Sequence, residues 1–90
     1  MNSLPALPNF APIASLTLAE LQADFSNSIA REMDFRELGQ RAEAGAVPSE
    51  IRAAYLAQVW RIVRAYSRRT NACLAAIKAI KAAPAARLAA

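Results

Sequence analysis

The chain has 90 residues, a formal net charge of +4, one cysteine and no histidine. A chain of this length forms one small domain at most, and folding alone buries only about 60–65% of its unfolded surface. One cysteine excludes an internal disulfide bond. Because histidine, a Cys/His cluster and a glycine-rich phosphate loop are all missing, we expect neither an enzyme nor a bound metal or cofactor.

Residues 1–16 predict a flexible leader. Pro5, Pro8 and Pro12 remove backbone donors and fix φ, which favours an extended and mobile segment. No basic region followed by a continuous apolar run marks a secretory signal peptide, and no stretch of about 18 uncharged apolar residues predicts a transmembrane helix. Four apolar side chains of the leader are candidates to dock on a partner: Leu4, Leu7, Phe10 and Ile13.

A first helix is expected from about residue 17 to residue 44. Thr17 and Glu20 have the spacing of a capping box, in which each side chain accepts a hydrogen bond from the other residue's backbone N–H. Gly45 is a natural C-terminal stop, and residues 45–48 form a short turn that favours an antiparallel hairpin. The helix has one apolar stripe: Leu18, Leu21, Phe25, Ile29 and Met33.

A second helix is expected from Pro48, at its first position, to about residue 83, where Pro84 ends it. Residues 85–90 are alanine-rich and predicted to be loose. The fold class is therefore all-α: a helical hairpin with a flexible leader and a long C-terminal amphipathic helix. That helix would be roughly 54 Å long at about 1.5 Å per residue.

The second helix has an apolar stripe with alternating steps of three and four residues, which keeps side chains on one face. We expect the first helix to be too short to cover it, so that part of it forms an interface between subunits. On this basis Val63→Asp or Ile77→Asp would prevent assembly and leave the chain helical. The predicted assembly interface is Leu56, Val59, Val63, Tyr66, Cys73, Ile77 and Ile80.

Charge is distributed unevenly along the chain. All seven acidic residues precede residue 51, and eight of the eleven basic residues follow it, which gives 3 − 7 = −4 for the first half and +8 for the second. The acidic residues Glu32, Asp34 and Glu37 have no surrounding pocket pattern and predict a solvated face rather than a hydrolytic pair. A predicted basic face on the second helix consists of Arg61, Arg64, Arg68 and Arg69.

The basic face leaves several partners open. Phosphate groups of nucleic acid are one, although no helix-turn-helix or other reader motif accompanies the arginines. A membrane surface is another, because Trp60 and Tyr66 lie beside them. Pairing with the acidic first helix is the third.

The run from Ile62 to Thr70, continued by Leu74 and Ile77, has an apolar pair, then a hydroxyl–Arg–basic step, then spaced aliphatic residues. Together with the opening at Pro48, this pattern resembles the last helix of the inner-rod subunits of bacterial type III secretion systems, which are relatives of the needle subunits. The resemblance covers about residues 48–80.

The resemblance implies a structural subunit that is exported through the type III apparatus. It would stack helically with copies of itself and other apparatus subunits in the periplasm. The alternatives from the sequence are a small cytoplasmic DNA-binding protein of the nucleoid type and a helical adaptor of a larger complex.

Overall fold

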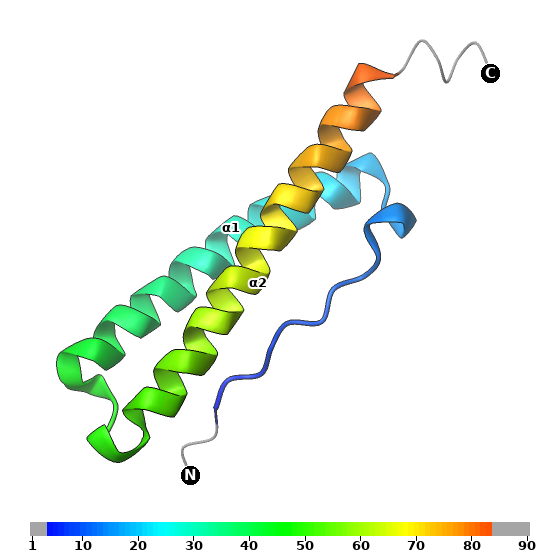
Figure 1. Ribbon diagram of the computed structural model, residues 1–90. Coiled ribbons are helices and arrows are strands. Elements are labelled where there is room, and N and C mark those ends of the chain that lie inside the picture. Colours follow the sequence, from blue (N-terminus) through cyan, green and yellow to red (C-terminus); the bar gives the residue numbers. More distant parts are fainter. Residues whose placement is uncertain (1–3, 84–90) are drawn as a thin grey trace.

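The computed structural model describes residues 4–83 and is an antiparallel helical hairpin (Figure 1). The described residues contain no strand, so the predicted all-α hairpin is confirmed. The molecule is elongated, with extents of 61 × 19 × 15 Å. Its elements in chain order are a 3₁₀ turn η1 (Ile13–Ser15), α1 (Leu18–Arg41), a wide helical turn η2 (Ala42–Ala46) and α2 (Ser49–Ala82).

The start of α1 is set by the capping box that the sequence predicts. The backbone N–H of Thr17 donates to Glu20 Oε1 at 2.9 Å, and the backbone N–H of Glu20 donates to Thr17 Oγ1 at 3.2 Å. Two N–H groups that the helix itself leaves unpaired are thereby satisfied. The carboxylate of Glu20 has its pKa lowered, first because it accepts the hydrogen bond from the Thr17 backbone.

The connection between the helices depends on Gly45 and Pro48. Gly45 has φ of +107°, a conformation that costs other residues strain, and it breaks the helical path at the end of η2. Pro48 is the cap rather than the first helical residue, because its ψ of 141° is extended, and α2 begins one residue later than predicted. Arg52 closes the turn by donating to the carbonyl oxygen of Val47 from Nε (3.2 Å) and Nη2 (2.9 Å).

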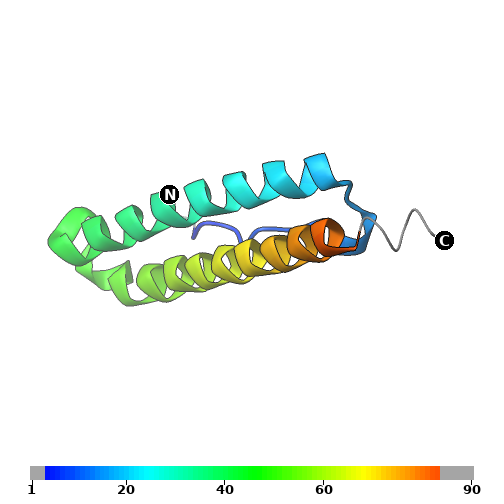
Figure 2. The same cartoon turned by 90° about the horizontal axis from the view of Figure 1, so that it is seen from above.

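The second helix is one continuous element of 34 residues, and Figure 2 shows it side by side with α1 along the hairpin. It ends at Ala82, two residues before Pro84, in agreement with the bias of a residue preceding proline away from helix. The predicted role of Pro84 and the predicted loose tail, residues 85–90, lie outside the described residues, as do residues 1–3.

The leader is extended, as predicted, but residues 4–16 lie along α2 of the same chain (Figures 1 and 2). Gln58 Nε2 donates to the carbonyl oxygen of Pro5 at 3.0 Å, and the ring of Phe10 contacts that of Tyr66. Near η1, Ile13 and Leu16 pack against the core. The side chains that we considered free to dock on a partner therefore contribute, in part, to covering this chain's own second helix.

The core consists mainly of α2 residues. Val59, Ile62 and Cys73 are fully buried, Val63 and Ile77 nearly so, and α1 adds Leu21 as its one large buried aliphatic side chain. The other two buried residues of α1 are small, Ser28 and Gly39. At Gly39 the helices approach closely, since a Cβ there would lie 2.8 Å from Cζ2 of Trp60.

Candidate functional site

The predicted assembly interface lies mostly inside the hairpin. Val59, Val63, Cys73 and Ile77 are buried, and three residues of the set are partly covered: Leu56, Tyr66 and Ile80. The stripe is more fully covered than expected, although Leu56, Tyr66 and Ile80 remain partly exposed. Its distal end is covered by side chains from outside the predicted first-helix stripe as well as from within it: Ile13, Leu16, Leu18 and Phe25.

A largely buried ion pair joins the two helices. Arg69 of α2 donates through Nε and Nη2 to Oδ2 of Asp24 on α1, the Nε contact being 2.9 Å. Ser28 Oγ donates to the other carboxylate oxygen, Oδ1, at 3.2 Å. The side chains of Arg69 and Asp24 are only 7% and 19% exposed. Since buried charges are tolerated only when paired, this contact fixes how the helices are aligned.

An aromatic group covers that ion pair. The ring centroid of Phe10 lies 4.9 Å from Cζ of Arg69, a cation–π geometry, and 5.5 Å from the Tyr66 ring in an edge-on arrangement. On its other side Tyr66 stacks with Phe35 of α1 at 6.0 Å. Arg69 therefore does not belong to an exposed basic face, because α1 and the N-terminal segment enclose its guanidinium.

Cys73 is part of the same buried region. Burial raises the pKa of its thiol, and the negative charge of Asp24 acts in the same direction. The thiol therefore remains protonated at neutral pH and packs as a small apolar side chain.

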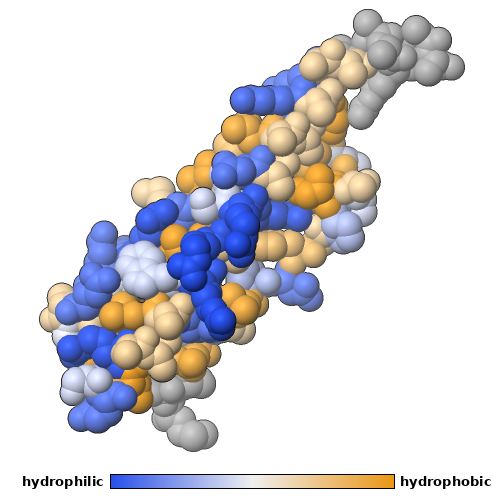
Figure 3. All heavy atoms as spheres, viewed as in Figure 1, coloured by the Kyte–Doolittle hydropathy of each residue, from blue (hydrophilic) through white to orange (hydrophobic). Residues whose placement is uncertain are grey.

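The remaining three arginines of the predicted basic face are exposed and form what we call the arginine row: Arg61, Arg64 and Arg68. They lie on one side of α2, and Figure 3 shows strongly hydrophilic side chains gathered over the middle of this helix. Among the described residues, none of the three has a carboxylate partner. These three members of the predicted basic face are thus exposed, whereas the fourth, Arg69, is buried.

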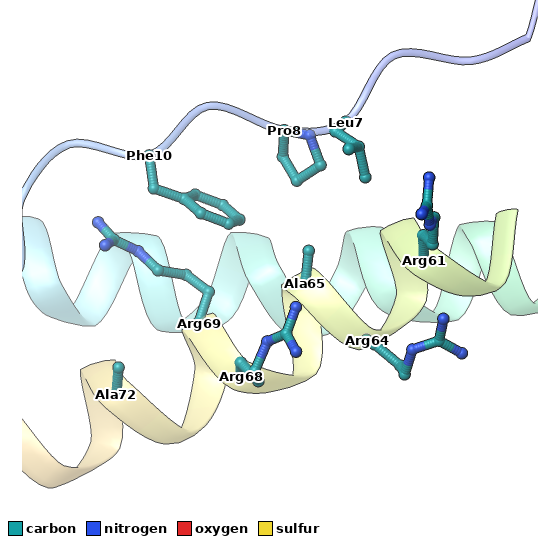
Figure 4. A pocket seen from close by; sticks show the side chains of 9 residues that line it. All are labelled: Leu7, Pro8, Phe10, Arg61, Arg64, Ala65, Arg68, Arg69 and Ala72. Carbon is teal, nitrogen blue, oxygen red and sulfur yellow. The ribbon is translucent and has the colours of Figure 1, made fainter. Parts of the chain in front are cut away.

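The arginine row borders a groove of about 590 Å³ between the N-terminal segment and α2. One wall is apolar and comes from Leu7, Pro8 and Phe10, and the floor is α2 (Figure 4). Leu7 is 51% exposed. The groove, which we call the arginine groove, thus combines guanidinium groups with an accessible apolar wall.

Among the described residues after the leader, the exposed large apolar side chains all belong to α1. Met33 is 64% exposed and Ile29 38%. At about 100° per residue they lie roughly 120° and 80° around α1 from Leu21 and Gly39, so both border the face that packs against α2. Leu38, 36% exposed, lies on another side. We define the outer face of α1 as five exposed residues: Ile29, Ala30, Met33, Asp34 and Glu37.

Within residues 4–83 no group of three or more His, Cys, Asp or Glu side chains is placed to hold a metal ion. The same part of the chain has no helix that is both long and apolar enough to cross a membrane. Two of the three clustered acids form ion pairs along α1: Glu32 pairs with Arg36 and Glu37 with Arg41, each four residues apart. The third, Asp34, is exposed.

Several residues that organise this region were missed from the sequence. Asp24 and Ser28 lie one helical turn apart on the same side of α1 as Leu21, a position where polar residues need a partner on the facing helix. A similar signal exists at Arg69, which falls at the edge of the apolar stripe. No local signal identifies Gly39 as the contact point of Trp60.

Comparisons of this chain with family models, curated proteins and solved structures give no match.

Proposed function

We propose that the protein is a structural subunit that assembles with copies of itself as the inner rod of a bacterial type III secretion apparatus. The observation that carries the proposal is the outer face of α1, where Ile29 and Met33 stay exposed although α2 and the N-terminal segment are already packed together. Contiguous apolar patches that a fold leaves exposed often mark interaction surfaces.

The proposal places the contact on a different helix from the one that the sequence suggested. In the closed hairpin the stripe of α2 is the core, so the outer face of α1 and the arginine groove are the surfaces left for other subunits. The resemblance of residues 48–80 to inner-rod subunits supports the choice of machine. It implies export through the apparatus and assembly in the periplasm with needle and export-apparatus subunits.

The test is the mass of the protein in solution. Light scattering during size-exclusion chromatography should show a mass that rises with concentration, or a complex with needle or export-apparatus subunits. Met33→Asp should abolish both and leave the circular dichroism unchanged. Asn71→Asp adds the same charge at an exposed position of α2 outside the arginine groove and should behave as wild type. A wild-type protein that stays monomeric alone and in every mixture would exclude the proposal.

A second candidate function is nucleic-acid binding, favoured by the three exposed arginines without described carboxylate partners. If they neutralise phosphates, affinity for duplex DNA falls with salt at a slope of about −0.9 per phosphate. Changing all three to glutamine should then flatten that slope. We expect weak binding that is lost near physiological salt; tight binding under those conditions would make this the leading function.

A further inference from the structure

We propose that the arginine groove of one copy binds the outer face of α1 of a second copy, with Arg64 and Arg68 opposite Asp34 and Glu37. This contact rests on the proposed self-assembly and specifies its two surfaces. It assigns a partner to the arginine row, which has no described carboxylate within its own chain.

The carboxylates on the outer face of α1 are available for such a contact. Asp34 is exposed and makes no hydrogen bond or ion pair among the described residues. Glu37 pairs with Arg41, but both side chains are more than half exposed, at 59% and 65%. Surface pairs of this kind contribute little, so Glu37 can exchange its partner without a large cost.

The spacing of the two rows is compatible. Asp34 and Glu37 are three residues apart, which is about 4.5 Å along a helix, and Arg64 and Arg68 are four apart, about 6 Å. Helices packed side by side at 8–10 Å bring such rows within reach of long side chains. A guanidinium pairs with a carboxylate through two parallel hydrogen bonds, which adds specificity to the charge attraction.

The apolar parts of the two surfaces match as well. Met33 projects from the outer face of α1 between the carboxylates and Ile29, and it is the most exposed large apolar side chain described. In the arginine groove, Leu7 is half exposed on the apolar wall. A docked helix would remove both from water, which supplies the non-directional part of the association.

The contact must form between different copies. In one molecule Asp34 and Glu37 lie on the side of α1 away from Leu21 and Gly39, whereas the arginine groove lies between the N-terminal segment and α2, so the two surfaces cannot meet. Because they are different patches, the contact is heterologous, and each added copy leaves one of each patch free. Such a contact grows into an open, helical array.

The same features favour a protein partner over nucleic acid. The wall made by Leu7, Pro8 and Phe10 offers apolar surface where phosphate contacts need donors.

The experiment uses two charge-reversed proteins. The first is Arg64→Glu/Arg68→Glu, altered only in the groove, and the second is Asp34→Lys/Glu37→Lys, altered only on the outer face. Each alone should place like charges opposite each other and raise the apparent Kd for self-association at least about tenfold. An equimolar mixture should assemble again, because each altered patch then meets an oppositely charged one. Lys78→Glu/Lys81→Glu is the matched control, since it changes the net charge as much as the first variant does at exposed sites outside the groove.

Recovery of assembly in the mixture, with wild-type behaviour of the control, would establish the contact. If wild type assembles and both altered proteins assemble equally well, this contact is wrong while the proposed function stands. If wild type never assembles, alone or with apparatus subunits, the proposed function fails and this contact with it. A monomeric wild type that binds duplex DNA at about 0.15 M salt, and loses this on groove reversal, would assign the groove to nucleic acid instead.

Discussion

The two helices divide the work of the hairpin unequally. Six α2 side chains are buried, five of them apolar, whereas α1 buries Leu21, Ser28 and Gly39. The first helix contributes Asp24, which pairs with Arg69, and Gly39, which lets the helices approach closely at Trp60. It also has an exposed apolar outer face. The helix with the longer apolar stripe, α2, thus packs most of that stripe into the core, whereas α1 keeps exposed apolar side chains that are available to a partner.

The largest expected effect compares the stability cost of a carboxylate in the α2 core with that of one on the outer face of α1. Val63→Asp places a carboxylate in the α2 core, where the native side chain is 3% exposed, and should cost at least about 3 kcal/mol of unfolding free energy. The variant should lose helicity, contrary to the expectation from the sequence that it stays folded. Met33→Asp on α1 should change stability by less than about 0.5 kcal/mol. Urea denaturation followed by circular dichroism measures both, and equal stabilities would contradict the division.

The next effect tests the ion pair between Asp24 and Arg69. Arg69→Met removes the charge that pairs with the mostly buried Asp24 and should destabilise by about 3 kcal/mol. Adding Asp24→Asn to that variant should recover part of the loss, because no unpaired charge then remains. The neighbouring exposed Arg68 is the control, and Arg68→Met should cost less than about 0.5 kcal/mol. Similar losses at Arg69 and Arg68 in thermal or urea unfolding would show that the pair contributes little.

A smaller effect tests the close approach of the helices. Gly39→Ala puts a methyl group 2.8 Å from the Trp60 ring, and overpacking of this kind costs about 1–3 kcal/mol, against a gain of about 1 kcal/mol in helix propensity. We expect net destabilisation of about 1 kcal/mol. In a Trp60→Leu background the same substitution should become stabilising. Equilibrium unfolding of the four proteins gives the coupling, and an unchanged sign would show that the ring does not set the distance.

The last effect, similar in size to that of Gly39→Ala, is at the start of α1. Thr17→Ala should cost about 1 kcal/mol, the usual value for an N-cap. Because the pKa of Glu20 is lowered in the folded state, its contribution is complete above its ordinary pKa and is lost as pH falls through the lowered value. Glu20→Gln should flatten this part of the pH dependence. Urea midpoints of wild type and Glu20→Gln, measured at successive acidic pH values, test this contribution. Identical pH profiles for these two proteins would contradict it.

The sequence by itself determined the two helices, the start of the first and the break between them. The capping box at Thr17 and Glu20 and the break at Gly45 depend on hydrogen bonds and φ values within a few residues. The alternation in α2 likewise identified one apolar face and the opposite arginine row, because helical spacing fixes directions around a single axis.

Only the tertiary structure decided what covers each face. Arg69 has the same chemistry as Arg68, and only the position of Asp24, 45 residues away in the chain, makes it a buried partner instead of a surface charge. The N-terminal segment is extended on local grounds, yet its place along α2 depends on Phe10 meeting Tyr66 and Arg69. Such contacts depend on how the two helices and the N-terminal segment are aligned in space. Local helix propensity does not encode that alignment. The sequence alone therefore could not show that the α2 stripe would be core and that the outer face of α1 would stay exposed.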